Sequence, residues 1–289
     1  MKQGTAGRGA ERLAAAVIAV GVLACVGAGM SGFAPGGAAV AAAPRDGDGR
    51  QGFDTVVLDA GHGGEDRGAR GARGLLEKDL VLDVSQRLAR RLRDRGLRVV
   101  MTRKEDRFVG LEERTAIAND ARGDLFVSIH ANAASARRAR GTETFFASLD
   151  ATDESSRELA ELENMSFSRE GRRPVSEDPL VAILGDLIAN EHLRESQEFA
   201  RFAQERLAKL KLARSRGVKQ APFVVLLGVQ MPAALVELGF LTNTEEEASL
   251  RTPAHRERLA DALDRAVGEF AERYDARRGV SRAASPGGR

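Results

Sequence analysis

Apolar and polar positions alternate with the periods of helices and strands over residues 55–274. Short apolar runs bounded by polar or glycine-rich sequence predict strands, and apolar residues spaced by three and four positions predict helices. The clearest helical stripe is Leu80, Val84, Leu88 and Leu92. The predicted strands are residues 55–59, 98–102, 124–129, 141–147, 223–227 and 233–238. The predicted helices are residues 77–95, 111–121, 196–211 and 256–274.

Strands that alternate with helices of this length are typical of an α/β domain, in which helices flank a largely parallel sheet. We therefore predict a single α/β domain over residues 55–274. One connection is much longer than the others, because about fifty residues separate the fourth predicted strand from the third predicted helix. Connections of this length often carry function. Asp178 and Pro179 suit the start of a helix there. We treat residues 151–195 as a helical insertion in the domain.

The N-terminal region has the pattern of an export signal. A positively charged start precedes a nearly continuous apolar run over residues 13–30, and the small residues that follow end in Ala39-Val40-Ala41. This pattern predicts a signal peptide over residues 1–43 that is cleaved near Ala41. Two other interpretations remain open, because the apolar run is just long enough for a retained membrane anchor and Cys25 could carry a lipid.

The segments on either side of the predicted domain are polar and rich in glycine. We expect residues 44–54 to form a flexible linker. We expect residues 275–289, which are also basic, to form a disordered tail. Little sequence separates the leader from the domain, so we expect no additional targeting domain between them.

The charge balance and the cysteine count narrow the chemistry. Lys and Arg number 44 and Asp and Glu number 42, so the formal net charge is only +2 and gives little attraction to nucleic acid, which we exclude as a partner. The one cysteine lies in the leader, so the exported chain would have neither a disulfide nor a thiolate metal site. Any metal must be held by carboxylates and by the four histidines, His62, His130, His192 and His255.

Two of these histidines follow predicted strands. His62 comes after the first strand and His130 directly after the third. In open α/β sheets, sites form outside the carboxyl ends of the strands, so these two imidazoles can converge. Glu77 begins the first helix, close in sequence to the loop of His62. Two histidines and a glutamate would make a three-ligand zinc site with one position open for water.

Each of these residues is also compatible with a plainer role. A histidine at a strand end is more often a hydrogen-bonded polar residue than a ligand, and the helix dipole alone favours Glu77 at a helix N-terminus. The glycine-rich loop over residues 61–74 suggests phosphate binding only weakly. Asp66 stands where a dinucleotide loop needs its third glycine, and no Gly-Lys-Ser/Thr follows.

Glu237 adds a carboxylate near the end of the apolar strand 233–238. A carboxylate in such a run is costly unless it is used. Beside metal-activated water it could act as a general base. The plainer interpretation is a side chain that reaches solvent at the strand end.

Taken together, the motifs resemble the zinc-dependent N-acetylmuramoyl-L-alanine amidases of the amidase-3 type. The resemblance covers residues 55–274, and its motifs are Val57–Gly64, Glu77–Leu80, Ser128–Asn132, Arg216–Ala221 and Val236–Phe240. The family cuts the amide bond between N-acetylmuramic acid and L-alanine in peptidoglycan. The resemblance therefore implies this substrate for the present chain.

The resemblance also implies the roles of individual residues. His62, Glu77 and His130 would be the zinc ligands, and Glu237 would take a proton from the attacking water and pass it to the departing amine of L-alanine. We also expect Asn132 to orient His130.

The insertion resembles that of the cell-division amidases, in the segments Glu163–Ser166 and Asp178–Leu180. The resemblance implies a helix that covers the active site until a protein activator removes it. Glu163 would then fill the open zinc position as an inhibitory ligand. The alternative is a structural cover that never moves.

The resemblance to division amidases implies a Gram-negative periplasm as the location. We expect a monomer with no stable membrane span after cleavage of the leader. Two other functions remain open at this point. One is a non-catalytic scaffold that binds peptidoglycan, and the other is a zinc peptidase that acts on the stem peptide.

Overall fold

The structure is a computed structural model that describes residues 52–168, 191–210 and 214–280. Its strands are β1 Thr55–Ala60, β2 Arg98–Met101, β3 Leu125–Asn132, β4 Thr142–Ala147, β5 Ser215–Ala221 and β6 Ala233–Phe240. Its helices are α1 Glu77–Asp94, α2 Leu111–Asp120, α3 Glu154–Ser168, α5 Glu191–Ala208, α6 Val224–Leu227, α7 Thr244–Leu250 and α8 Pro253–Arg277.

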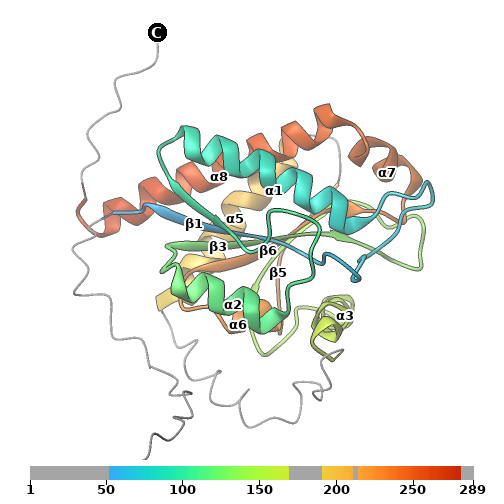
Figure 1. Ribbon diagram of the computed structural model, residues 1–289, viewed down its shortest axis with the longest axis horizontal. Helices are drawn as coiled ribbons and strands as arrows, with labels where there is room; N and C mark the ends of the chain where they lie inside the picture. The colour runs from blue at the N-terminus through green and yellow to red at the C-terminus, as the bar shows by residue number, and fades with distance from the viewer. Residues whose placement is uncertain (1–51, 169–190, 211–213, 281–289) are drawn as a thin grey trace, which may run out of the picture. The chain divides into compact units, whose positions relative to one another are not determined.

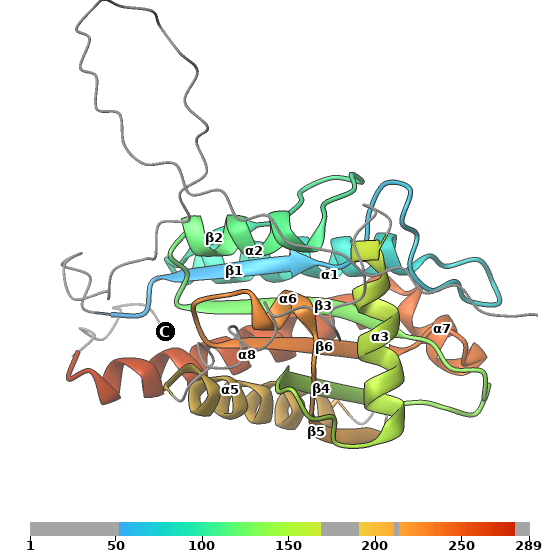
Figure 2. The same ribbon diagram turned by 90° about the horizontal axis from the view of Figure 1, so that it is seen from below.

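The strands form one six-stranded sheet in the order β2-β1-β3-β6-β4-β5. The pair β4 and β6 is antiparallel, and every other neighbouring pair is parallel. Figures 1 and 2 show helices on both faces, with α1, α5 and α8 on one side and α2, α3 and α6 on the other. The predicted α/β fold with a largely parallel sheet is confirmed.

Alternation along the strands decides which face each side chain joins, because successive residues of a strand point to opposite faces. Val56 and Leu58 pack in the core beneath α1, α5 and α8, whereas Val57 packs in the core beneath α2 and α6. Both cores are apolar, which explains why the central strands have nearly continuous apolar sequence.

The same alternation brings the chemically important residues to one face. An even number of positions separates His130 from Phe126 on β3 and Glu237 from Leu235 on β6, so the two members of each pair point to the same face of the sheet. Phe126 and Leu235 both belong to the core on the α2 side. The register places His130 of β3 directly opposite Glu237 of β6. Two residues far apart in sequence therefore project side by side at the same end of the sheet.

One predicted strand is wrong. Residues 223–227 form the short helix α6 after Phe223, and the edge strand is β5, which the apolar pattern did not predict. A short apolar run cannot be assigned to helix or strand by periodicity alone. Gly228 follows the run directly and ends the helix α6. The edge strand β5 is polar and half-exposed, so it lacks the apolar signal of a central strand.

The insertion contains a helix that the pattern did not predict. Asp153 accepts hydrogen bonds from the N–H and the hydroxyl of Ser156, at 2.8 and 2.6 Å, and so begins α3. Leu162 and Met165 of α3 are each 60% exposed, so the apolar residues of this helix do not all lie on the face that packs against the core. The helix expected after Asp178 lies outside the described residues. The helix α5 begins at Glu191 rather than at Ser196. The helix α7 was not predicted.

The domain extends beyond both expected boundaries. Phe53, expected in the linker, is only 2% exposed and packs edge-on against Phe270 and Tyr274. Its N–H donates to the carboxylate of Asp275, which was expected in the tail. The helix α8 continues to Arg277. The predicted signal peptide lies outside the described residues, and no described helix is long and apolar enough to cross a membrane.

Through His255, we expect the stability of the fold to depend on pH. It lies in the first turn of α8 and is 5% exposed. Burial, followed by the positive charge of Arg258, lowers the pKa of His255 to about 4. A histidine in the unfolded chain titrates at about pH 6.5, so the unfolded state binds more protons than the native state between these values. Stability contributed by neutral His255 is therefore complete above about pH 6.5 and is lost as the pH falls towards 4.

We expect His255→Leu to remove this dependence. In urea titrations between about pH 7 and about pH 4.5, the free energy of unfolding of the wild type should fall more steeply than that of the variant, by about 1 kcal/mol per pH unit. Equal slopes for the wild type and His255→Leu would contradict the assignment.

Candidate functional site

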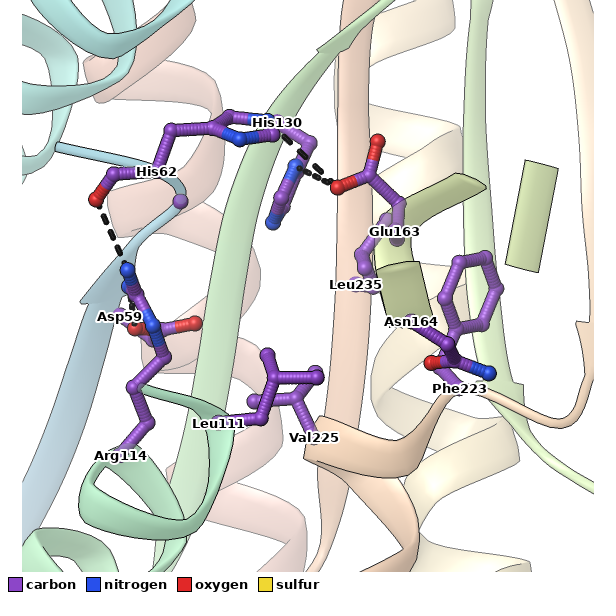
Figure 3. A pocket seen from close by; sticks show the side chains of 11 residues that line it. Asp59, His62, Leu111, Arg114, His130, Glu163, Asn164, Phe223, Val225 and Leu235 are labelled. Atoms are coloured by element: carbon purple, nitrogen blue, oxygen red, sulfur yellow. Dashed lines mark hydrogen bonds and ion pairs between the residues drawn. The ribbon is translucent and has the colours of Figure 1, made fainter. Parts of the chain in front are cut away.

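Four side chains from separate elements converge at the carboxyl ends of β1 and β3. They are His62, Glu77, His130 and Glu163, and their candidate ligand atoms all lie within 4.8 Å of one another. The first three are buried and Glu163 is half-buried. Figure 3 shows Glu163 reaching from α3 towards both imidazoles. The structure thus brings together the three residues predicted as ligands and the one predicted as an inhibitory ligand.

Glu77 connects the two histidines. Its Oε1 lies 3.0 Å from Nε2 of His62 and 3.1 Å from Nδ1 of His130. The backbone N–H of Ala69 donates to Oε2, and that of Ala131 donates to Oε1. Burial opposes the charge of the Glu77 carboxylate, but the two imidazoles outweigh burial and hold its pKa well below the usual range.

The imidazoles respond in the opposite direction. Burial opposes their positive charge, but the carboxylates of Glu77 and Glu163 outweigh it and raise the pKa of His62 to about 10. The same two carboxylates raise the pKa of His130 well above its ordinary value. Oε2 of Glu163 lies 3.1 Å from Nδ1 of His130 and 3.5 Å from Nε2 of His62. The cluster therefore has a strong electrostatic preference for positive charge between its carboxylates.

The loop of His62 needs glycine where it passes the cluster. A Cβ added at Gly61 would clash with the ring of His130, and one added at Gly68 would clash with Glu77 and His62. His62 itself has a φ of 56°, in the left-handed region that non-glycine residues rarely adopt. Contacts from the rest of the fold must hold this conformation.

Two buried arginines provide those contacts. Arg114 of α2 donates to the carbonyl oxygen of His62 at 2.8 Å and to Oδ1 of Asp59 at 2.6 Å. Arg103 donates to the carbonyl oxygen of Gly61 at 2.7 Å. The sequence analysis did not identify these residues. For Asp59, the sequence contained a signal, because a carboxylate stands at the end of an apolar strand. For the two arginines, the sequence contained no such signal.

Asp66 is a further functional residue that the sequence analysis missed. Its Oδ2 lies 3.0 Å from Nδ1 of His62 and so fixes which ring nitrogen faces the cluster. Nε2 of His62 is buried and has no hydrogen-bond partner among the described residues, although it lies near Glu77. An orphaned ring nitrogen aimed at carboxylates is the arrangement expected of a metal ligand.

Glu237 is completely buried beside this cluster, across the strand pair from His130. Neither of its carboxylate oxygens has a hydrogen-bond partner among the described residues. Burial raises the pKa of Glu237 well above its ordinary value; the positive charge of His130 opposes this shift, and the carboxylates of Glu77 and Glu163 reinforce it. Perturbed carboxyl groups of this kind are concentrated at functional sites.

Asn132 does not orient His130 as expected. Its amide donates to Oε1 of Glu143 at 2.6 Å. Glu143 lies opposite Glu237 on β4 and also pairs with Arg216 at 3.0 Å and Lys219 at 2.9 Å. Asn132 therefore belongs to an ionic network on the far side of Glu237.

The donor set indicates which ion would fit. Two imidazole nitrogens and carboxylate oxygens, without thiols, match the ligands of catalytic zinc sites and differ from the all-oxygen sites of magnesium and calcium. His62, Glu77 and His130 could hold the ion, and Glu163 lies where a fourth ligand would bind. The fold and this site define an α/β domain with a candidate metal centre and a buried carboxyl group beside it.

Comparison with known proteins identifies the family. Residues 56–269 match the amidase-3 family, N-acetylmuramoyl-L-alanine amidase. The chain belongs to this family.

Curated relatives agree with the match. AmiA of Escherichia coli K12, an N-acetylmuramoyl-L-alanine amidase, is 34% identical over 222 residues, which cover 76% of this chain and 77% of AmiA. AmiC of Escherichia coli O6:H1, another N-acetylmuramoyl-L-alanine amidase, is 36% identical over 215 residues. That match covers 72% of this chain but only 50% of AmiC, so the chain spans about half the length of this relative.

Solved structures agree as well. An N-acetylmuramoyl-L-alanine amidase from Clostridium difficile 630 has a TM-score of 0.58 at 28% identity, covering 76% of this chain and 98% of its own. AmiC2 of Nostoc punctiforme, also an N-acetylmuramoyl-L-alanine amidase, has a TM-score of 0.56 at 28% identity and covers 76% of this chain and 97% of its own. The sheet and its flanking helices are therefore those of the family.

The contact between Asp66 and His62 generates a prediction. Removing the carboxylate in Asp66→Ala frees the imidazole to rotate and lowers its basicity, so we expect the affinity for Zn²⁺ to fall by about 10- to 100-fold. Competition with a chromogenic chelator measures this affinity directly. Glu65→Ala, on the exposed neighbouring residue, is the matched control and should bind as the wild type does. Unchanged affinity in Asp66→Ala would contradict the role of Asp66 in holding the His62 ring.

Proposed function

We propose that this protein is a zinc-dependent N-acetylmuramoyl-L-alanine amidase of the bacterial cell envelope. His62, Glu77 and His130 are the proposed zinc ligands, and Glu237 is the proposed catalytic residue. The observation that carries the proposal is the convergence of the His/Glu cluster with a buried, unpartnered carboxyl group, in a chain of this amidase family.

The residues of the site suggest how the reaction proceeds. A bound zinc ion would supply Lewis-acid activation of water and of the substrate carbonyl. Glu237 accepts a proton from the attacking water and delivers it to the departing amine of L-alanine. The raised pKa of Glu237 suits the first step, because it makes the carboxylate a stronger base towards the attacking water.

The two other interpretations have less support. A scaffold that only binds peptidoglycan gains nothing from a buried carboxyl group without a partner, which costs stability. A zinc peptidase could use the same ligands, but the family match favours the amide bond at the sugar.

We further propose that α3 holds the enzyme inactive until a protein activator displaces it. Glu163 supports this, because its carboxylate lies against both histidines, where a water molecule or the substrate carbonyl must approach.

The proposed location, the periplasm after cleavage of residues 1–43, rests on the basic and apolar leader and on the relatives. Peptidoglycan as substrate and an activator as partner follow from the same proposal.

Glu237→Gln tests the chemistry. The amide keeps the volume of the side chain but cannot accept the proton from water, so we expect the rate of peptidoglycan cleavage to fall by about 10²- to 10⁴-fold. Zinc content should stay at the wild-type level. Mass spectrometry of the wild-type products should show intact stem peptides with a free N-terminal L-alanine. Products cut within the stem peptide would instead identify a peptidase, and no cleavage under any condition would favour a scaffold.

Glu163→Ala tests the inhibition. Removing the carboxylate opens the fourth position without disturbing Leu159 and Ala160, through which α3 contacts the core. We expect basal activity to rise by about tenfold or more, because a loss of about 1.4 kcal/mol from the closed state changes its population tenfold. Glu161→Ala, on an exposed residue of the same helix, should leave the activity unchanged. If Glu163→Ala has wild-type activity, α3 is only a structural cover.

A further inference from the structure

The motif Arg216–Ala221 has no role in the reaction described so far. It lies in the edge strand β5, which pairs with β4. Because β4 and β5 run antiparallel to β6, β5 begins at the end of the sheet where β6 ends beside the cluster. Arg216 lies near this start and is 31% exposed. It is therefore a half-buried cation at the same end of the sheet as the proposed catalytic residues.

Two contacts hold the guanidinium group of Arg216. Its Nε donates to Oε2 of Glu143 at 3.0 Å, and the group lies over the ring of Phe240, 5.1 Å from the ring centroid. Neither Nη1 nor Nη2 has a hydrogen-bond partner among the described residues. The planar group is thus fixed in place while its outer pair of nitrogens stays open, and such a pair matches the two oxygens of a carboxylate.

Neutralisation of Glu143 alone does not account for Arg216. Glu143 already accepts from Nζ of Lys219 at 2.9 Å and from the amide of Asn132 at 2.6 Å. An arginine that served only as the counter-ion of Glu143 would be expected to use two nitrogens in the bidentate geometry. Arg216 uses one, so most of its donors remain available for a ligand.

The sheet sets the distance between Arg216 and the reacting centre. Glu143 lies directly opposite Glu237 in the register of β4 and β6, so the two side chains share one face of the sheet. Arg216 lies on the next strand and contacts Glu143 on that face. Neighbouring strands are about 4.8 Å apart, so about 10 Å of sheet separates the backbone of Arg216 from that of Glu237.

The proposed substrate has a carboxylate at a matching distance. The residue after L-alanine in a stem peptide is D-glutamate, which continues the chain through its side-chain carboxyl group and so keeps a free α-carboxylate unless this group is amidated. Two extended residues span about 7 Å, and the side chain of Arg216, which leans towards β4, covers the remaining distance.

Resting on the proposed amidase function, we propose that Arg216 binds the α-carboxylate of D-glutamate and makes the enzyme selective for stem peptides in which this group is not amidated. A carboxylate accepts two charge-assisted hydrogen bonds from the open pair of nitrogens. A carboxamide is neutral, and its NH₂ group would face donors of the guanidinium. Arg216 thus reads the charge of the second residue of the stem peptide.

Two isomeric substrates test this selectivity in the full chain. N-acetylmuramoyl-L-alanyl-D-glutamine has a free α-carboxylate and N-acetylmuramoyl-L-alanyl-D-isoglutamine has a free γ-carboxylate, so their masses and charges are equal. We expect kcat/KM of the wild type to be about tenfold higher for the D-glutamine isomer, and Arg216→Gln to abolish this preference. The preference compares two substrates of one protein, so neither the active fraction nor the cover formed by α3 changes it.

Two further variants control for charge and for folding. Arg214→Gln removes the same charge from an exposed arginine two residues away and should keep the tenfold preference. Arg216→Lys keeps a cation beside Glu143 but lacks the planar pair of donors, so we expect a preference of about threefold or less. A wild type without preference, or Arg216→Gln protein that retains it, would overturn the proposal and leave Arg216 as a structural ion pair.

Calorimetric titration distinguishes this proposal from the amidase function. L-alanyl-D-glutamine and L-alanyl-D-isoglutamine are titrated into Glu163→Ala protein with and without Arg216→Gln. We expect about tenfold tighter binding of the first peptide, which Arg216→Gln removes. The same result in a protein that cleaves neither substrate would mean that the amidase function fails while the carboxylate site stands. Equal binding of the two peptides would overturn the carboxylate site, whether or not the protein is an amidase.

Discussion

The arrangement of the site depends on one buried carboxylate, Glu77, placed between two imidazoles. Buried charge is costly unless it is paired and hydrogen-bonded, and Glu77 meets both conditions through His62, His130 and two backbone N–H groups. One of those N–H groups comes from the glycine-rich loop and the other from β3. The first residue of α1 therefore ties together the loop after β1 and the end of β3, and the geometry of the cluster follows from this connection.

The electrostatics of Glu237 follow from the same cluster. Burial raises the pKa of Glu237, which has no hydrogen-bond partner among the described residues, and three neighbouring carboxylates also raise it. The charge of the neighbouring Glu143 is compensated, because Glu143 pairs with Arg216 and Lys219. Glu237 has no such partner, and its raised pKa makes its carboxylate a stronger base, which is the property that the proposed proton transfer needs.

In the proposed regulation, the helix α3 connects the site to the polar edge of the sheet. Lys219 pairs with Glu143 in the sheet at 2.9 Å and with Asp153, the residue that begins α3, at 3.1 Å. Further along the helix, Glu163 contacts His62 and His130, and Asn164 exchanges hydrogen bonds with Pro222 and Val224. A helix held by these contacts would cover the cluster without any distortion of the proposed ligands. An activator would then have to compete only with the contacts of α3, and not rebuild the site.

The sequence by itself determined the fold class, the central strands and the long helices, because their apolar periods are regular. It also determined the candidate residues His62, Glu77, His130 and Glu237, since each stands at the end of a predicted element or within an apolar run. It did not reveal β5 or α3, whose positions in the fold are half-exposed, or the helical state of residues 224–227. Only the tertiary structure decided that Arg103 and Arg114 support the His62 loop, that Asn132 faces Glu143, and that Asn164 pairs with Pro222 and Val224. These contacts join residues from separate elements, and no local pattern of a sequence encodes which surfaces the folded chain brings together.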